Sequence, residues 1–210
     1  MTATIPNLDY DQYRAEARDA DIALWAPRDQ IGRIIAAETG GPYCHVSGIA
    51  FDCYGRLWQY GYHAVTHGGY GSPLSKEVRQ NSGYITIFRL KPEFKFEPEH
   101  VVEHLVGDLG GDYAMGDIRI NVDAWLFDKF PFLKRVFRGT YEKRVEVSDR
   151  KKSTADCSHH IARAYKLGTH ISLCDKPLSL ISPNDIARST ALRPVGTLVW
   201  PAHFGRRRVA

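Results

Sequence analysis

The chain has 210 residues, of which 43% are hydrophobic and 25% charged, and its formal net charge is +4. This composition is ordinary for a soluble globular protein, and the length suits one domain with a real core. No apolar run approaches the roughly 18 residues that a membrane-spanning helix needs, and the first residues lack the apolar centre of a signal peptide. We therefore expect one domain over residues 1–210 that starts in a cytoplasm (cytoplasmic localisation), with delivery as a phage or effector protein left open.

The four cysteines are far apart in the sequence and form no CxxC pair: Cys44, Cys53, Cys157 and Cys174. In a reducing compartment this spacing argues against a disulfide framework and leaves room for a reactive thiol. The positive charge gathers partly in residues 133–152, which suggests modest attraction to an anionic membrane and no specific nucleic-acid partner.

The periodicity of apolar residues predicts the elements in chain order. The first half is expected to hold a short exposed helix over 9–19, a strand over 21–26, a helix over 28–41, and a hairpin of strands 44–51 and 56–62 turning at Gly55. The second half is expected to hold helices over 74–83, 96–110, 117–130 and 153–168, and strands over 84–90 and 193–201. Because strands gather in one region and helices flank them, the predicted fold class is α+β.

Cys157 is the strongest candidate for a nucleophile. It lies in the first turn of the helix predicted over 153–168, after the possible caps Ser153 and Thr154. There the unpaired backbone N–H groups and the helix dipole favour the thiolate. The neighbouring Asp156 opposes this, so a histidine is needed to activate the thiol. A small core residue on the buried face of the helix is the other interpretation of Cys157.

His45 is the candidate base, at the start of the strand predicted over 44–51. A histidine at the end of an apolar row is also commonly a satisfied core residue. On the next strand, Gln59 can lie near His45 if the hairpin registers around Gly55, and can then hold one ring nitrogen by a hydrogen bond. Otherwise Gln59 is an exposed polar residue of the strand.

The order of the segments resembles the circularly permuted papain-like cysteine hydrolases of the NlpC type, in particular their YiiX/YebB-like group. The runs that carry this resemblance are DIALWAPRDQIGRIIAAETGGPYCHVSGIAF, RLWQYGYHAVTHGGYGSPLSKEV, GGDYAMGDI, DCSHHIARAYKLG and ISPNDIARS. Together they cover roughly residues 20–190. The resemblance implies a permuted papain-like fold, with a small antiparallel sheet or half-barrel packed against helices, and a helical and basic insertion at about 115–152.

The same resemblance implies the roles of the site residues. Cys157 would be the nucleophile, His45 the base and Gln59 the orienting group of a thioester mechanism that needs no metal or cofactor. The Cys157 N–H and either Tyr43 or Tyr113 would hold the oxyanion, although both tyrosines are equally well read as packing residues. The expected substrate is a peptide, a peptidoglycan-like molecule or a lipid or acyl compound. Peptidase, amidase and acyltransferase activities all stay open.

Three features depart from the family pattern, and three other functions compete. HVSGIAF is one residue longer than the HVGI of the family, Ala20 stands where the family has Gly, and Gln59 stands where Glu or another polar group is common. A zinc module is one alternative, although its candidate ligands fit no compact finger spacing: Cys44, His45, Cys53, His63 and His67. The others are a catalytically inactive scaffold and an anionic-surface binder acting through residues 133–152. Four histidines without a role are expected at the surface or rim: His63, His67, His159 and His160.

Overall fold

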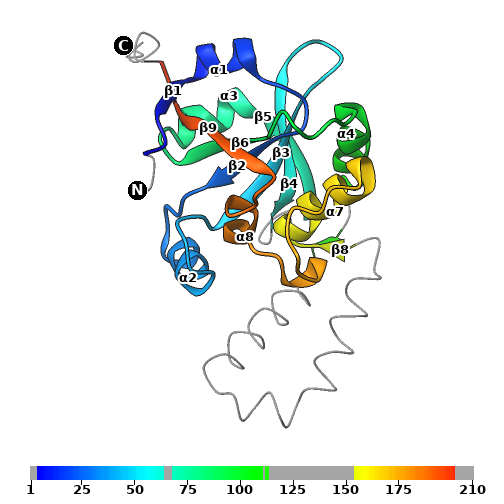
Figure 1. Ribbon diagram of the computed structural model, residues 1–210. Coiled ribbons are helices and arrows are strands. Elements are labelled where there is room, and N and C mark those ends of the chain that lie inside the picture. The colour runs from blue at the N-terminus through cyan, green and yellow to red at the C-terminus, as the bar shows by residue number, and fades with distance from the viewer. Residues whose placement is uncertain (1–3, 64–67, 111, 114–153, 202–210) are drawn as a thin grey trace.

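The computed structural model describes residues 4–63, 68–110, 112–113 and 154–201. Its centre is a seven-stranded sheet in the order β1-β9-β6-β2-β3-β4-β5 (Figure 1). The strands are β1 (Asn7–Asp9), β2 (Asp21–Trp25), β3 (His45–Phe51), β4 (Leu57–His63), β5 (Gly68–Pro73), β6 (Ile85–Leu90), β7 (Asp112–Tyr113), β8 (Thr154–Ala155) and β9 (Leu192–Val199). The helices are α1 (Tyr10–Glu16), α2 (Gln30–Glu38), α3 (Leu74–Gln80), α4 (Pro98–Gly107), α7 (Cys157–Thr169), the 3₁₀ turn η1 (Leu178–Leu180) and α8 (Pro183–Ala187).

The predicted α+β class is confirmed, and the sheet is wider than the small sheet expected. Its neighbouring strands pair antiparallel except β1 and β9, which are parallel. The short strands β7 and β8 form a separate parallel pair. The helix predicted over 117–130 and the basic segment 133–152 lie outside the described residues. None of the described helices has the length and apolar character to cross a bilayer.

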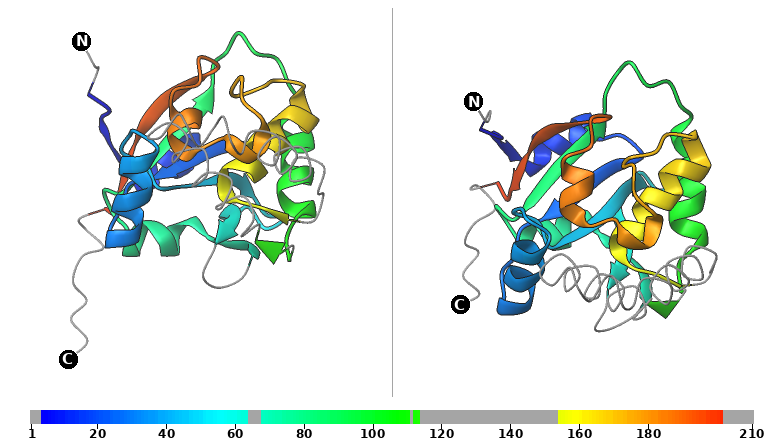
Figure 2. Two further views of the ribbon diagram at one scale, coloured as in Figure 1. Left: turned by 90° about the horizontal axis from the view of Figure 1, so that it is seen from below. Right: turned by 60° about the horizontal axis from the view of Figure 1, so that its bottom comes forward.

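Alternating side chains of the sheet feed two separate cores. In the central strand β2, Ile22 and Leu24 belong to the core beneath α4 and α7, whereas Ala23 belongs to the core beneath α1 and α3. Helices α4 and α7 lie side by side on the first face (Figure 2). Helix α1 is less exposed than expected, because Tyr10 and Tyr13 are buried in the second core.

Helix α2 is confirmed, but the face that its three isoleucines share is exposed rather than buried. Ile31 is 68% exposed, and Ile34 and Ile35 are exposed as well. The buried residues are Gly32 and Ala36. A Cβ added at Gly32 would lie 3.2 Å from the Cys44 sulfur. The small residues therefore let the helix backbone come close to the chain just before β3.

The helix predicted over 153–168 is confirmed with different ends. Thr154 belongs to β8 and does not cap the helix, and Ser153 lies outside the described residues. The cap is Asp156, whose carboxylate accepts the backbone N–H of His159 at 2.7 Å. The helix then runs one residue past Gly168 and ends at the left-handed His170.

Candidate active site

Cys157 is the first residue of α7 and its side chain is buried against the start of β3. The backbone N–H of Val46 donates a hydrogen bond to the thiol. That N–H lies beyond the β3–β4 ladder, which ends at the pair Ser47 and Gly61. The fold therefore brings the nucleophile predicted from the sequence to the residue that directly follows His45.

Burial governs the ionisation of this thiol. Desolvation, and then the charge of Asp156, raise the pKa of Cys157 to about 12. The hydrogen bonds from Val46 and Ser158 lower the pKa by less, and the Ser158 hydroxyl is 3.9 Å from the sulfur. Burial thus opposes the thiolate that the helix N-terminus was expected to favour. At neutral pH the sulfur carries its proton.

His45 begins β3 and lies directly opposite Trp25 of β2. The two rings meet edge to face with centroids 5.9 Å apart. The indole N–H of Trp25 in turn donates to the Ser47 hydroxyl at 3.2 Å. Packing against a large ring, which is itself held by a hydrogen bond, restricts the position of the imidazole next to the Val46 contact.

Gln59 does not lie where its predicted role requires. The hairpin register puts it opposite Ile49, four residues along β3 from His45. Its side-chain amide donates instead to the Tyr70 hydroxyl at 3.0 Å and to the Ser72 hydroxyl at 2.9 Å. Gln59 is fully buried, which also corrects the alternative of an exposed strand residue. The two strands of a hairpin pair residues that are equally far from the turn, and His45 lies farther from the turn than Gln59 does. The predicted contact between them therefore does not form.

The two candidate oxyanion tyrosines differ. Tyr43 is buried with its ring edge to face with Phe88, and its hydroxyl is hydrogen-bonded to Thr86. These contacts make it a packing residue. Tyr113 pairs with Ala155 in the β7–β8 ladder, two residues before Cys157, so its backbone lies beside the nucleophile segment. The side chain of Tyr113 lies outside the described atoms.

Asn184 is a residue that the sequence reasoning missed. It is buried, its Oδ1 accepts the backbone N–H of Tyr43 at 3.0 Å, and its Nδ2 donates to the Tyr43 carbonyl at 2.8 Å. This double contact fixes the chain two residues before His45. The capping box formed by Ser182 and Asp185 positions Asn184 at the start of α8. In the sequence, the run ISPNDIARS shows this capping box with Asn184 inside it, and this is the pattern that could have indicated the residue.

His159 and His160 are buried rather than at the surface or rim, with 0% and 1% exposure. The His160 ring packs on Tyr62 with centroids 4.8 Å apart, and its Nδ1 is 3.4 Å from Asp108 Oδ2. Desolvation lowers the pKa of His160, against the opposite effect of Asp108. The side chain of His63 and all of His67 lie outside the described atoms.

The candidate zinc ligands do not converge in the described part of the chain. The Cys44 thiol donates to the Trp25 carbonyl at 3.4 Å, and burial raises its pKa to about 11. Cys53 is exposed in the turn at the other end of β3. Among the residues that the structure describes, no group of three His, Cys, Asp or Glu side chains could hold a metal ion.

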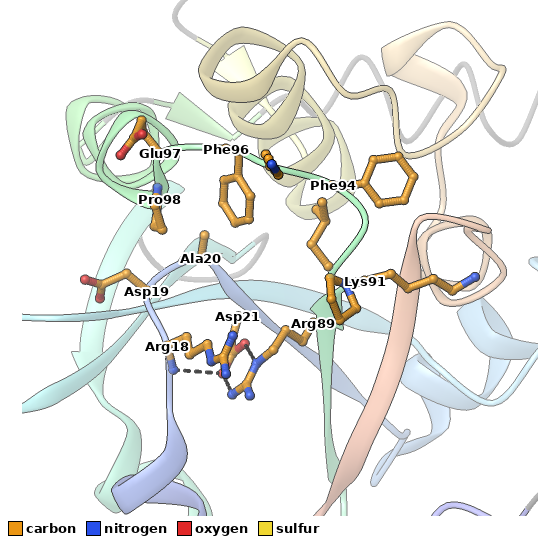
Figure 3. Close-up of a pocket in the computed structure, with 13 residues that line it drawn as sticks. Arg18, Asp19, Ala20, Asp21, Arg89, Lys91, Phe94, Phe96, Glu97 and Pro98 are labelled. Carbon is orange, nitrogen blue, oxygen red and sulfur yellow. Dashed lines mark hydrogen bonds and ion pairs between the residues drawn. The ribbon is translucent and has the colours of Figure 1, made fainter.

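A separate pocket of about 420 Å³ lies at the other end of β2 (Figure 3). Asp21 and Arg89 line it as a buried bidentate ion pair, with N–O distances of 2.6 and 2.7 Å. Ala20 on its wall has φ of 64°, a left-handed conformation that glycine adopts at lower cost than alanine. The lining holds neither Cys157 nor His45, so we do not place the chemistry in it.

No protein-family model and no curated protein matches this chain. Among solved structures, the chain is similar to the crystal structure of metalloprotein yiiX from Escherichia coli O157:H7. The TM-score is 0.58 at 12% sequence identity, and the match covers 88% of this chain and 98% of that chain. The likeness establishes a YiiX-like fold, which agrees with the predicted resemblance at the level of fold alone.

Proposed function

We propose that this chain is a cysteine hydrolase that cleaves an amide or ester bond through a thioester on Cys157, with His45 as the general base. The observation that carries the proposal is the hydrogen bond from the Val46 N–H to the Cys157 thiol, because Val46 directly follows His45. The YiiX-like fold supports it, because this is the fold group that the resemblance implies.

The mechanism starts from a protonated thiol, since burial holds the pKa of Cys157 at about 12. As the sulfur attacks a carbonyl carbon, His45 accepts the thiol proton and a C–S bond forms. The carbonyl π pair moves to oxygen, where the Cys157 backbone N–H at the start of α7 can bind it. The tetrahedral intermediate expels the amine or alcohol, which takes the proton from His45, and water hydrolyses the thioester. A different acceptor in the last step would make the enzyme an acyltransferase.

The structural neighbour is called a metalloprotein. In the part of this chain that the structure describes, the histidine, cysteine and acidic side chains form no group of three suited to a metal ion. No step of the proposed mechanism therefore passes through a metal.

The test uses p-nitrophenyl acetate, an ester that acylates the enzyme rapidly and releases a burst of p-nitrophenol as it does so. Cys157→Ser and His45→Ala should lower the acylation rate by about 10²-fold or more, the usual contribution of a nucleophile or a general base. Cys53→Ser is the control, because Cys53 is exposed in a turn, and it should keep the burst. An unchanged burst in Cys157→Ser would overturn the proposal. No burst from the unmodified protein, with this probe and with amide probes, would favour the inactive scaffold.

A further inference from the structure

The pocket at the far end of β2 contains a buried guanidinium whose hydrogen-bond donors are only partly used. Arg89 is 8% exposed; its Nε and Nη2 donate to the Asp21 carboxylate, and Nη2 also donates to the Glu16 carbonyl. Its Nη1 donates to none of the residues that the structure describes. Because a guanidinium carries five N–H donors, the pair at Nη1 is left over. Arg89 lines the pocket, so these donors are available to an acceptor oxygen of a ligand.

Asp21 fixes the orientation of this guanidinium. The carboxylate takes the edge formed by Nε and Nη2, so Nη1 lies on the edge away from it. Asp21 is itself held, because it also accepts the Tyr13 hydroxyl at 3.0 Å and the Arg18 backbone N–H at 3.1 Å. A buried ion pair is a weak source of stability, since desolvation offsets most of its attraction. Its position beside a cavity therefore favours a role in binding.

A strained residue forms the pocket wall next to this pair. Ala20 has φ of 64°, a conformation that costs alanine free energy and persists only where its surroundings impose it. Here its N–H donates to the Ile49 carbonyl at 2.9 Å, and its carbonyl accepts from the Tyr165 hydroxyl. Strained residues of this kind cluster at ligand sites. The wall is thus fixed before a ligand binds, which lowers the entropy cost of binding.

The rest of the lining indicates what the ligand carries besides an acceptor oxygen. The ring of Phe96 points toward Ala20 from the segment before α4 (Figure 3). Leu90, Pro92 and Pro98 add apolar surface. Four basic and three acidic side chains line the pocket, which leaves an excess of one positive charge. Its volume of about 420 Å³ is that of a small-molecule site. These features fit a molecule with one negative charge and an apolar part.

We propose that this pocket binds a small monocarboxylate with an apolar tail. A carboxylate oxygen accepts from Arg89 Nη1, and the tail lies against the Phe96 ring. Arg18, an exposed residue of the lining, adds attraction for the anion. The lining holds neither Cys157 nor His45, so this site is separate from the candidate active site and the inference does not depend on the hydrolase function.

The test measures the binding of sodium octanoate by isothermal titration calorimetry, with octan-1-ol and octylamine as ligands of equal chain length. Octanoate should bind at one site about tenfold or more tightly than either, because only octanoate can accept a charge-assisted hydrogen bond from Arg89. Arg89→Lys keeps a cation beside Asp21 but lacks the planar fork. It should lower the octanoate affinity by about tenfold or more and change the octan-1-ol affinity by less than about twofold.

A second variant keeps the test decisive if Arg89→Lys does not fold. Phe96→Ala should weaken octanoate and octan-1-ol alike, because both have the same tail. Arg18→Ala should weaken octanoate alone, by about two- to fivefold, as expected for an exposed charge. Arg14→Ala is its matched control, since Arg14 is exposed on α1 and does not line the pocket.

Three results would overturn the inference. The first is no saturable binding of octanoate. The second is an affinity for octan-1-ol or octylamine that equals or exceeds the affinity for octanoate. The third is an octanoate affinity that stays within about twofold of the unmodified protein in Phe96→Ala, or in Arg89→Lys at equal thermal stability.

Discussion

The four thiols differ in burial, and we expect their reactivity to differ with it. Desolvation is the first cause that raises the pKa of Cys157 to about 12 and of Cys44 and Cys174 to about 11. Cys53 alone is exposed. Since only the thiolate is alkylated, the order of labelling reports these environments.

Iodoacetamide at neutral pH should therefore modify Cys53 first and Cys157 slowly. The rates follow from mass spectrometry of the peptides over time, and labelling in urea, where burial is lost, should make the four rates similar. If Cys157 reacts first in the folded protein, it forms an ion pair with His45 before substrate binds, and the mechanism starts from the thiolate.

The positions of Cys157 and His45 could be predicted because each depends on local sequence. A helix start and a strand start are marked by cap residues and by the alternation of apolar residues. The partner of Gln59 depends on the register, and a strand slip of a few residues changes every cross-strand pair. The contact of Asn184 with Tyr43 joins segments 141 positions apart. The local pattern in ISPNDIARS marks a helix start, but it does not indicate which distant segment Asn184 contacts.

At the scale of elements, strands with β-branched and aromatic residues were predictable and the edge strands were not. The hairpin of β3 and β4 and the strand β6 were expected and are present. Strand β5 has the sequence GGYGSP, which carries no strand propensity. It forms because β4 offers it a row of backbone hydrogen bonds. Helix α2 exposes its isoleucines, against the rule that apolar residues face the core, so its buried face does not follow from its apolar pattern.

The packing of α4 on α7 rests on the missing side chain at Gly168. A Cβ there would lie 2.7 Å from the backbone nitrogen of Val101 and 2.8 Å from the carbonyl carbon of His100. Backbone atoms cannot move aside as a flexible side chain can. Gly168→Ala should therefore push the helices apart and destabilise the protein by about 1–3 kcal/mol, measured by urea unfolding.

Gly107 at the end of α4 is the matched control, because a Cβ added there would have no atom of the described residues within 4 Å. Gly107→Ala should leave stability unchanged or raise it by up to about 1 kcal/mol, from the better helix propensity of alanine. Equal effects of the two substitutions would contradict close packing at Gly168.

Across the whole molecule, the sheet separates two cores, and the candidate nucleophile begins the helix that covers one of them. That helix carries two buried imidazoles, in His159 and His160, beside the first turn. The C-terminal end of α4 contributes Asp108, which also contacts Arg163 at 3.2 Å. We therefore expect protonation in the region that holds Cys157 to act on folding.

Acid should weaken the fold through His160. Its pKa is lowered from 6.5 by burial, despite Asp108, while Arg163 and His159 add to the lowering. As the pH falls below about 6.5, the unfolded chain therefore binds a proton at His160 before the folded protein does. The stability that neutral His160 contributes is then lost progressively until the pH has passed the pKa of His160 in the folded protein. Asp108, whose pKa is lowered from 3.8, contributes a second loss only at lower pH. Urea unfolding between about pH 5 and 8 should show stability falling toward acid, and His160→Gln should flatten that slope. An unchanged slope in the variant would assign the effect to another group.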